Sequence, residues 1–327
     1  MAKNIIVSNR LPIRISKVDN SYKFTPTSGG LATGMKSIHE QDSALWIGWP
    51  GIGRDEIADD AWTPLNNGLI NNNFAPVSLS KAEVDDFYYG LANKCLWPLF
   101  HYFIEYSIFN EAHWETYVDV NKKFSERVLE HIDSRDTVWI HDYQLLLCPK
   151  MIKDVRPDVN IGFFLHIPFP SFEIFRIFPW REALLEGMLG ADLIGFHTYN
   201  YERHFLSSVK RILRKNVQFN RVTVGSREVV VDTFPMGIDY AKFNDAAKTH
   251  LTQKQAEKSA LKIQLDVHKK GTDESKLILS IDRLDYTKGV VNRIKAFDLF
   301  LTKYPEYLEK VRLVMLTVPS RSDVREY

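Results

Sequence analysis

The sequence predicts a doubly wound α/β fold, and three observations support this prediction. Short apolar segments recur along the 327 residues. Most of these segments are apolar throughout rather than alternating, which is typical of strands buried on both faces of a parallel sheet. Amphipathic helical patterns separate them, and strands that alternate with helices imply right-handed βαβ units.

Continuous apolar segments predict the strands, and the helical spacing of apolar residues predicts the helices. The apolar segments predict strands at 4–8, 44–49, 74–79, 137–142, 160–167, 192–198, 228–234, 276–281 and 311–317. Apolar residues at i, i+3 or i+4, and i+7 predict helices, and they do so at 115–132, 199–215 and 291–305. A more polar helix is expected at 245–265.

A domain boundary is predicted where Pro, Gly and Asp follow a strand in the segment "PMGIDYAKFND". We expect 1–238 to form an N-terminal domain and 239–327 to begin a second one. Only two strands are recognisable after the boundary, and two strands do not make an independently stable sheet. We therefore expect the second domain to continue beyond Tyr327 in a longer protein.

The composition excludes several classes of function. A net charge of +1 gives no global field that would attract nucleic acid or an anionic membrane. No run reaches the roughly 18 apolar residues of a membrane span, and the first residues lack a secretory signal. Cys95 and Cys148 lie in apolar contexts. This pattern predicts a reduced, cytoplasmic protein.

Ligands of open α/β sheets bind outside the carboxyl ends of the strands, so the residues that follow each strand are candidates. Arg10 follows the first strand, and Gly30 lies in a Gly-Gly helix start, "TSGGLATG". Backbone N–H groups at a helix start bind phosphate. The pattern is not G-x-G-x-x-G, which disfavours a nicotinamide cofactor. A surface arginine and simple turn chemistry are the alternatives.

Three successive strands end in polar residues. His141 and Asp142 follow one strand, and His166 and His197 follow the next two. Three such positions in register suggest a cleft that offers hydrogen bonds to a polyol. A zinc site is the alternative, but the chain has neither H-E-x-x-H nor paired-cysteine spacing.

An aromatic segment, 87–102, supplies candidates for stacking on a sugar face. Tyr88 and Trp97 are the two candidates. A core helix is the alternative interpretation of this segment, and it is the better one for Phe100, Tyr102 and Phe103.

The segment "SIDRLDYTKGV" places charge at the end of a buried strand. Arg283 and Lys288 precede a helix that begins near Gly289. Two cations beside a helix N-terminus suit a diphosphate, and they would stabilise it as a leaving group. Many nucleotide-sugar enzymes use a metal held by D-x-D for this purpose, and the chain has no D-x-D. The cations are therefore interpreted as substitutes for a metal.

Ten motifs, in order from residue 4 to residue 325, closely resemble the trehalose-6-phosphate synthase family. They are VSNRLP, SGGLATG, WIGWPG, YYGLANKCLWPLFHY, WIHDYQLL, FFLHIPFPS, LLGADLIGFHTYNY, PMGID, DRLDYTKGV and PSRSDV. The resemblance implies a retaining glycosyltransferase of GT-B architecture, with two Rossmann-like domains facing a cleft. The second domain would be incomplete in this chain, which lacks the family's later acidic motif.

The resemblance also implies the reaction. Glucose would pass from UDP-glucose to glucose 6-phosphate with retention, giving α,α-trehalose 6-phosphate, with no metal or other cofactor. Two alternatives stay open: a non-catalytic sugar-phosphate sensor of the same fold, and the synthase half of a synthase/phosphatase fusion. The resemblance leaves open a homo-oligomer and a fused or separate trehalose-phosphate phosphatase.

On the acceptor side, the resemblance implies that Arg10 and Arg321 clamp the phosphate of glucose 6-phosphate. Tyr88, Trp97 and Asp142 would contact the acceptor sugar. Retention without an enzymic nucleophile would proceed by attack on the front face, so Asp142 is counted among the catalytic residues without being assigned as a nucleophile.

On the donor side, Gly30 is implied as a contact to UDP-glucose, and His166 as a catalytic residue at the donor glucose. Arg283 and Lys288 would bind the diphosphate and act as catalytic charge donors. No metal ligand is predicted.

Overall fold

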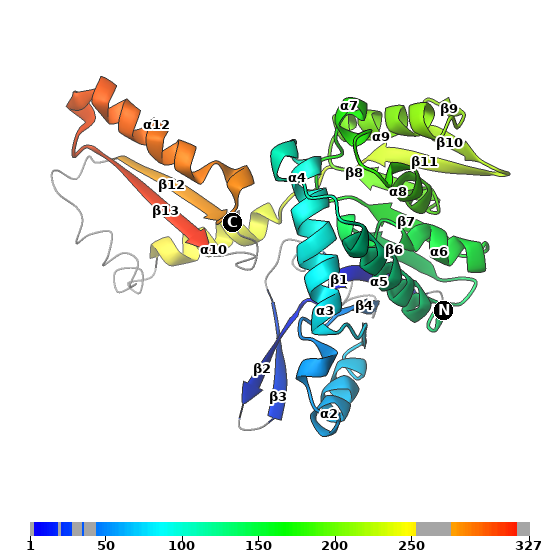
Figure 1. The fold of residues 1–327 in the computed structure, drawn as a ribbon. Coiled ribbons are helices and arrows are strands. Elements are labelled where there is room, and N and C mark those ends of the chain that lie inside the picture. Colours follow the sequence, from blue (N-terminus) through cyan, green and yellow to red (C-terminus); the bar gives the residue numbers. More distant parts are fainter. Residues whose placement is uncertain (1–2, 19–20, 28–34, 36–43, 253–275, 319–327) are drawn as a thin grey trace. The chain divides into compact units, whose positions relative to one another are not determined.

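The computed structural model describes residues 3–18, 21–27, 35, 44–252 and 276–318. The chain separates into two compact units, Met1–Met236 and Gly237–Tyr327 (Figure 1).

The N-terminal unit is built on a nine-stranded sheet with the order β5-β4-β1-β6-β7-β8-β11-β10-β9. The strands from β5 to β11 run parallel, and β10 and β9 continue the sheet antiparallel. The strand bounds are β1 (Asn4–Arg10), β4 (Leu45–Trp49), β5 (Phe74–Pro76), β6 (Thr137–His141), β7 (Asn160–Phe164), β8 (Leu193–Phe196), β9 (Val217–Gln218), β10 (Arg221–Val224) and β11 (Arg227–Thr233). The doubly wound prediction is confirmed.

The central strands are apolar because both of their faces are covered. Ile5, Ile6 and Val7 of β1 are fully buried, as are Val138 and Ile140 of β6. The two strands pair in register, with Ile5 opposite Val138 and Val7 opposite Ile140. This burial on both sides is the reason that the sequence pattern shows continuous apolar runs rather than alternation.

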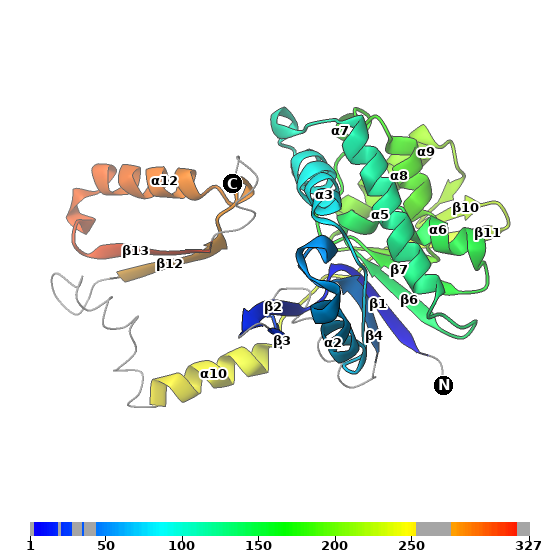
Figure 2. The ribbon, with the colours of Figure 1, turned by 60° about the horizontal axis from the view of Figure 1, so that its bottom comes forward.

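Helices pack on this sheet, and α5 (Glu111–Leu129) shows how the sequence specifies them. Its N-cap Asn110 accepts a hydrogen bond from the His113 backbone N–H at 3.3 Å, and it buries a stripe made of Tyr117, Val120, Phe124 and Val128. The helix packs beside α6 (Cys148–Val155), which contacts α8 (Arg181–Met188) (Figure 2). The remaining helices of this unit are α2 (Asp59–Ile70), α3 (Lys81–Glu83), the π-helix η2 (Val84–Leu96), α4 (Trp97–Phe100), α7 (Phe172–Phe175), α9 (Tyr199–Ile212) and the short η1 (Arg54–Glu56), η3 (Ile104–Tyr106) and η4 (Tyr143–Leu145).

A hairpin that the sequence analysis did not predict follows β1. It pairs β2 (Ile13–Val18) with β3 (Ser21–Pro26) antiparallel. Its apolar residues alternate, and Ile13, Ile15 and Phe24 pack into a cluster with residues of β4 and α2.

The described residues of the C-terminal unit include a βαβ element. The strands β12 (Lys276–Arg283) and β13 (Val311–Val318) are parallel, and α12 (Val290–Lys303) and η7 (Pro305–Tyr307) connect them. The short η6 (Tyr286–Lys288) joins β12 to α12, and α10 (Tyr240–Thr252) opens the unit. The two predicted strands are confirmed here. Of the predicted helix at 245–265, the part from 253 onward lies outside the described residues.

Candidate functional site

The strand order of the N-terminal unit indicates where a ligand would bind. We refer to this point, the carboxyl ends of β1 and β6, as the crevice. From β1 the chain adds β4 and β5 on one side and then β6, β7 and β8 on the other. The order therefore reverses between β1 and β6. Ligands of doubly wound sheets bind at the carboxyl ends of the strands at such a reversal. Arg10 ends β1, and Asp142 directly follows β6, so two of the predicted site residues lie at this point.

The guanidinium of Arg10 is held against a fixed surface. Its Cζ lies 5.6 Å from the centroid of the Trp49 ring, at a distance suited to a cation–π contact. Gly51 lies directly beside it with a φ of +91°, and an added Cβ there would approach Arg10 Nη2 to 2.5 Å. The segment "WPG" thus needs glycine both for its backbone conformation and for room. Arg10 itself is exposed, which leaves its cation accessible to an anion.

Asp142 has a strained backbone. Its φ is +75° and its ψ is 171°, a region that is essentially restricted to glycine and costs of order 1–3 kcal/mol. Hydrogen bonds hold it there: its N–H donates to the Phe164 carbonyl at 2.8 Å, and its carbonyl accepts the Leu145 N–H at 3.1 Å. Its carboxylate Oδ1 accepts the backbone N–H of His166 at 3.2 Å. Strain of this kind concentrates at functional sites.

The three strand-ending histidines come together. The His141 and His166 rings have centroids 5.3 Å apart, and those of His166 and His197 are 5.6 Å apart. His141 Nδ1 lies 3.1 Å from His166 Nε2, which is hydrogen-bond distance. Phe164 packs against both His166 and His197. The three strand-end histidines thus lie close together, and their role in binding a polyol stays a prediction.

Burial keeps these imidazoles neutral. Desolvation, assisted by the neighbouring His166, lowers the pKa of His141 to about 3. Desolvation alone lowers the pKa of His166 to about 4. The pKa of His197 is also lowered by burial and by His166, and the Asp142 carboxylate opposes that shift. At neutral pH the cluster therefore offers neutral hydrogen-bonding groups rather than positive charge.

A cavity of about 320 Å³ adjoins the histidines. Its lining includes His141 and His166 and is otherwise mostly apolar, with Met35, Trp139 and Phe164 among the side chains. A mostly apolar pocket with a few convergent polar groups is the usual form of a small-molecule site.

The aromatic segment forms a wall against Tyr143, the residue that follows Asp142. Trp97 is 5% exposed, and its ring packs against His101, at 4.1 Å between centroids, and against Tyr143, at 5.7 Å. Tyr88 is half-buried on the π-helix η2, a rare form that often marks functional sites.

A buried amide ties this wall to the crevice. Asn93 Nδ2 donates to the Tyr88 carbonyl at 2.7 Å. Its Oδ1 accepts the hydroxyl hydrogen of Tyr143 at 2.9 Å, and Tyr143 directly follows Asp142. The sequence analysis missed Asn93. A polar residue within an otherwise apolar and aromatic segment was the available signal, because a buried amide requires partners.

The predicted diphosphate-binding residues lie in the C-terminal unit. Arg283 ends β12 and Lys288 ends η6, and both are exposed. The loop backbone between them is fixed: buried Asp285 accepts hydrogen bonds from the backbone N–H and the hydroxyl of Thr287, at 2.9 and 2.8 Å. Gly289, with a φ of +61°, is the N-cap of α12.

Arg293 on α12 braces the same loop. It donates to Asp282 at 2.7 Å, to the Lys288 carbonyl at 3.0 Å and to the Ser280 hydroxyl. The sequence analysis missed this residue, which lies one helical turn beyond the motif. Two further predicted residues, Gly30 and Arg321, lie outside the described residues.

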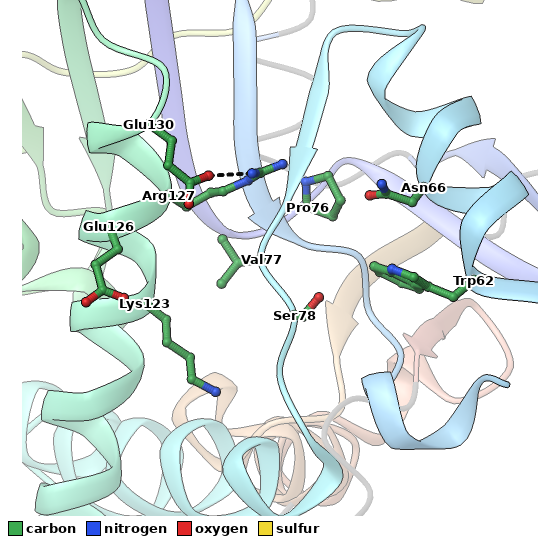
Figure 3. Close-up of a pocket in the computed structure, with 9 residues that line it drawn as sticks. All are labelled: Trp62, Asn66, Pro76, Val77, Ser78, Lys123, Glu126, Arg127 and Glu130. Carbon is green, nitrogen blue, oxygen red and sulfur yellow. Dashed lines mark hydrogen bonds and ion pairs between the residues drawn. The ribbon is translucent and has the colours of Figure 1, made fainter. Parts of the chain in front are cut away.

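A separate hollow of about 380 Å³ lies between α2, the segment after β5 and α5. Figure 3 shows Trp62 and Asn66 on one side and the charged side chains of α5 on the other. Arg127 pairs with Glu130 at 2.5 Å, and Lys123 pairs with Glu83 outside the lining. Because these cations already have acidic partners, the hollow offers no excess charge to a ligand.

Two further findings concern metal binding and membrane insertion. Within the described ranges, no group of three or more His, Cys, Asp or Glu side chains is arranged to hold a metal ion. Among the helices that the structure describes, none is long and apolar enough to cross a membrane.

Comparison with protein families matches residues 2–327 to the model of glycosyltransferase family 20. The chain is 41% identical over 333 residues to an alpha,alpha-trehalose-phosphate synthase [UDP-forming] of Candida albicans, covering 99% of the chain and 67% of that protein. It is 42% identical to the 56 kDa subunit of the corresponding Saccharomyces cerevisiae enzyme, covering 99% of the chain and 64% of that protein. The chain thus spans about two thirds of the length of these relatives.

Solved structures give the same result. A UDP-forming trehalose-phosphate synthase from Burkholderia xenovorans matches with a TM-score of 0.82 and 30% identity, over 99% of this chain and 66% of that one. The Escherichia coli enzyme bound with UDP-2-fluoro glucose matches with a TM-score of 0.81 and 30% identity, over the same shares. A further Burkholderia xenovorans structure, in complex with glucose-6-phosphate, has a TM-score of 0.80 and 26% identity, covering 100% of this chain and 68% of that one.

Proposed function

The chain belongs to glycosyltransferase family 20, and from this membership we propose that it forms most of a UDP-forming α,α-trehalose-phosphate synthase. Glucose passes from UDP-glucose to the anomeric hydroxyl of glucose 6-phosphate. The observation that carries the proposal is strained Asp142, held at the strand-order reversal beside Arg10 and His166. Relatives with solved structures bind a fluorinated UDP-glucose and glucose-6-phosphate, which supports this choice of substrates.

On the acceptor side, Arg10 binds the phosphate of glucose 6-phosphate, and Arg321 is proposed as its second cation. A planar guanidinium suits the bidentate recognition of phosphate. Asp142 accepts hydrogen bonds from acceptor hydroxyls, because a carboxylate has several acceptor positions and the His166 N–H occupies one of them. Tyr88 and Trp97 form the sugar-facing wall.

On the donor side, His166 contacts the glucose of UDP-glucose, and the Gly30 loop contacts the donor nucleotide sugar. Arg283 and Lys288 bind the diphosphate. They stabilise the charge that accumulates on it as the bond between sugar C1 and phosphate oxygen breaks. In this proposal no metal ion is required, since the two cations neutralise the leaving group.

The reaction proceeds with retention through attack on the front face of the donor sugar. The acceptor oxygen bonds to C1 on the side from which UDP leaves, and the departing phosphate oxygen takes the acceptor proton. Atoms balance without a covalent enzyme intermediate. Asp142 positions the acceptor rather than attacking C1, which separates this scheme from that of retaining glycosidases.

The proposal includes a cytoplasmic location, supported by the two buried free thiols. Cys95 and Cys148 are both reduced and buried. Burial raises the pKa of the Cys148 thiol to about 12, and that of Cys95 is raised as well. Such thiols are inert side chains of the core.

The test is direct assay of the full protein for UDP release from UDP-glucose that depends on glucose 6-phosphate, with the disaccharide phosphate identified by NMR. The expected product has both anomeric carbons in the α configuration. Binding of both substrates without turnover would instead favour a sugar-phosphate sensor. An inverted anomeric linkage would overturn the proposed stereochemistry.

A further inference from the structure

The contact between His141 and His166 contains one hydrogen whose position can be deduced. His141 is fully buried, and its Nδ1 lies 3.1 Å from His166 Nε2. The lowered pKa values, about 3 and about 4, keep both rings neutral at physiological pH. A neutral imidazole carries hydrogen on one nitrogen only. One ring must therefore donate and the other accept in this contact.

The second nitrogen of His141 decides which ring donates. His141 Nε2 is buried and has no hydrogen-bond partner among the described residues. The ring lines the 320 Å³ cavity, whose lining is otherwise mostly apolar. An unpaired buried N–H is rarer in proteins than an under-satisfied acceptor. The cheaper arrangement leaves Nε2 without hydrogen and places the hydrogen of His141 on Nδ1.

The tautomer of His166 follows from that arrangement. If His141 Nδ1–H donates, His166 Nε2 must accept, and the single hydrogen of His166 lies on its Nδ1. That Nδ1–H is then the hydrogen that the His166 ring can donate to a ligand.

We propose that His141 is a positioning residue that fixes His166 as its Nδ1–H tautomer, so that His166 meets a hydroxyl oxygen of the donor sugar as a hydrogen-bond donor. The contact with the sugar rests on the proposed function, whereas the tautomer does not. Without His141, the His166 ring could exchange hydrogen between its two nitrogens or rotate. The hydroxyl of the donor sugar would then face a protonated nitrogen of His166 in only a fraction of the molecules.

The direct experiment is ¹⁵N NMR on protein labelled at histidine, in which protonated and unprotonated ring nitrogens have distinct chemical shifts. A His166→Gln variant assigns the His166 signals among the 10 histidines. The expected wild-type result is an unprotonated His166 Nε2 and a protonated Nδ1. A protonated His166 Nε2 in the wild type would overturn the proposal.

Two matched variants test the role of His141 itself. His141→Asn places an amide near the position of Nδ1 and keeps the donor, so the His166 Nε2 should remain unprotonated. His141→Asp has a similar shape but offers only acceptor oxygens when ionised, so hydrogen should move to His166 Nε2. If both variants leave the His166 tautomer unchanged, His141 does not control it. Because buried Asp could impair folding, His141→Leu serves as a third variant, expected to give mixed His166 tautomers.

Kinetics of the full protein separate positioning from general structural support. His141→Asp and His141→Leu should lower kcat/KM for UDP-glucose roughly 3- to 10-fold, the size of one hydrogen bond, and His141→Asn should restore most of the loss. An equal loss in all three variants would overturn the positioning role. Absence of turnover in the wild type would overturn the proposed function, while the NMR result would still decide the tautomer.

Discussion

The crevice of the N-terminal unit and the cation loop of the C-terminal unit hold their charged side chains in different ways. In the crevice, hydrogen bonds hold Asp142 in a strained conformation, and Gly51 leaves room for Arg10 against Trp49. In the loop, Asp285 and Arg293 fix the backbone, but the side chains of the predicted phosphate ligands are exposed.

The two regions therefore affect the stability of the folded protein differently. In the crevice, the backbone strain at Asp142 and the burial of the imidazoles arise when the chain folds, before any ligand binds, and they lower the stability of the folded state. In the loop, the side chains of Arg283 and Lys288 are exposed, and exposed side chains contribute little to the free energy of unfolding. We therefore expect substitutions in the crevice to change stability as well as activity, and substitutions of the loop cations to change activity alone.

The sharpest test of this contrast is Arg283→Ala or Lys288→Ala. Each should lower kcat of the full protein by roughly 10²–10³-fold, the effect of losing one donor to the charge that develops on the leaving group. The free energy of unfolding should change little, because both side chains are exposed. Steady-state kinetics and urea denaturation measure the two quantities. Unchanged turnover would contradict the diphosphate role, and Lys310→Ala, on an exposed lysine of the same unit, is the control.

The second prediction concerns acid. In the unfolded chain His141 takes up a proton near its ordinary pKa of 6.5, and in the folded chain only near about 3. The unfolded state thus binds more protons as pH falls below 6.5, so this group lowers stability in that range. Between pH 6.5 and about 4.5 the loss should be roughly 2–3 kcal/mol.

The loss of unfolding free energy with falling pH is compared between wild type and His141→Asn. The difference between the two losses isolates the contribution of His141 from that of the other titrating groups, among them His166, His197 and Asp142. Urea denaturation at several pH values measures it. If the two proteins lose stability in parallel, His141 is not held neutral by the fold.

A third test addresses the strain at Asp142. Asp142→Gly and Asp142→Ala both remove the carboxylate, but only glycine relieves a φ of +75° with a ψ of 171°. The glycine variant should therefore be more stable than the alanine variant by about 1–3 kcal/mol, with both nearly inactive. Equal denaturation midpoints would show that the backbone relaxes.

The smallest expected effect is on the acceptor. Arg10→Lys keeps the charge but loses the planar fork, so the KM for glucose 6-phosphate should rise about tenfold, with little change in kcat. The reason is the loss of one charge-assisted hydrogen bond. Arg10→Ala should raise that KM further. An Arg10→Ala variant with normal dependence on glucose 6-phosphate would rule out the clamp.

Sequence reasoning predicted the parts of the fold that depend on burial. Strands enclosed on both faces, such as β1 and β6, appear as continuous apolar runs. The hairpin β2–β3 was missed because its apolar residues face only one side, and β9, with two residues, carries no periodic signal. The rare geometry of η2 has no sequence period of its own.

The proximity of His141, His166 and His197 could be predicted, because these residues lie at the ends of neighbouring parallel strands. The contacts that support the candidate site could not be predicted, because they are long-range. Asn93 and Tyr143 are 50 residues apart in the chain, and the strain at Asp142 arises only when the Phe164 carbonyl accepts its N–H. Local patterns carry no information about such pairs.

The placement of β1 at the centre of the sheet has a consequence for synthesis. Its neighbour β4 ends at Trp49, but its other neighbour begins only at Thr137. At roughly 5–20 residues per second, the ribosome takes about 4–18 s to make the intervening stretch. During that interval the backbone N–H and C=O groups along one edge of this apolar strand lack their partner strand, and this is where we expect a chaperone to engage the emerging chain.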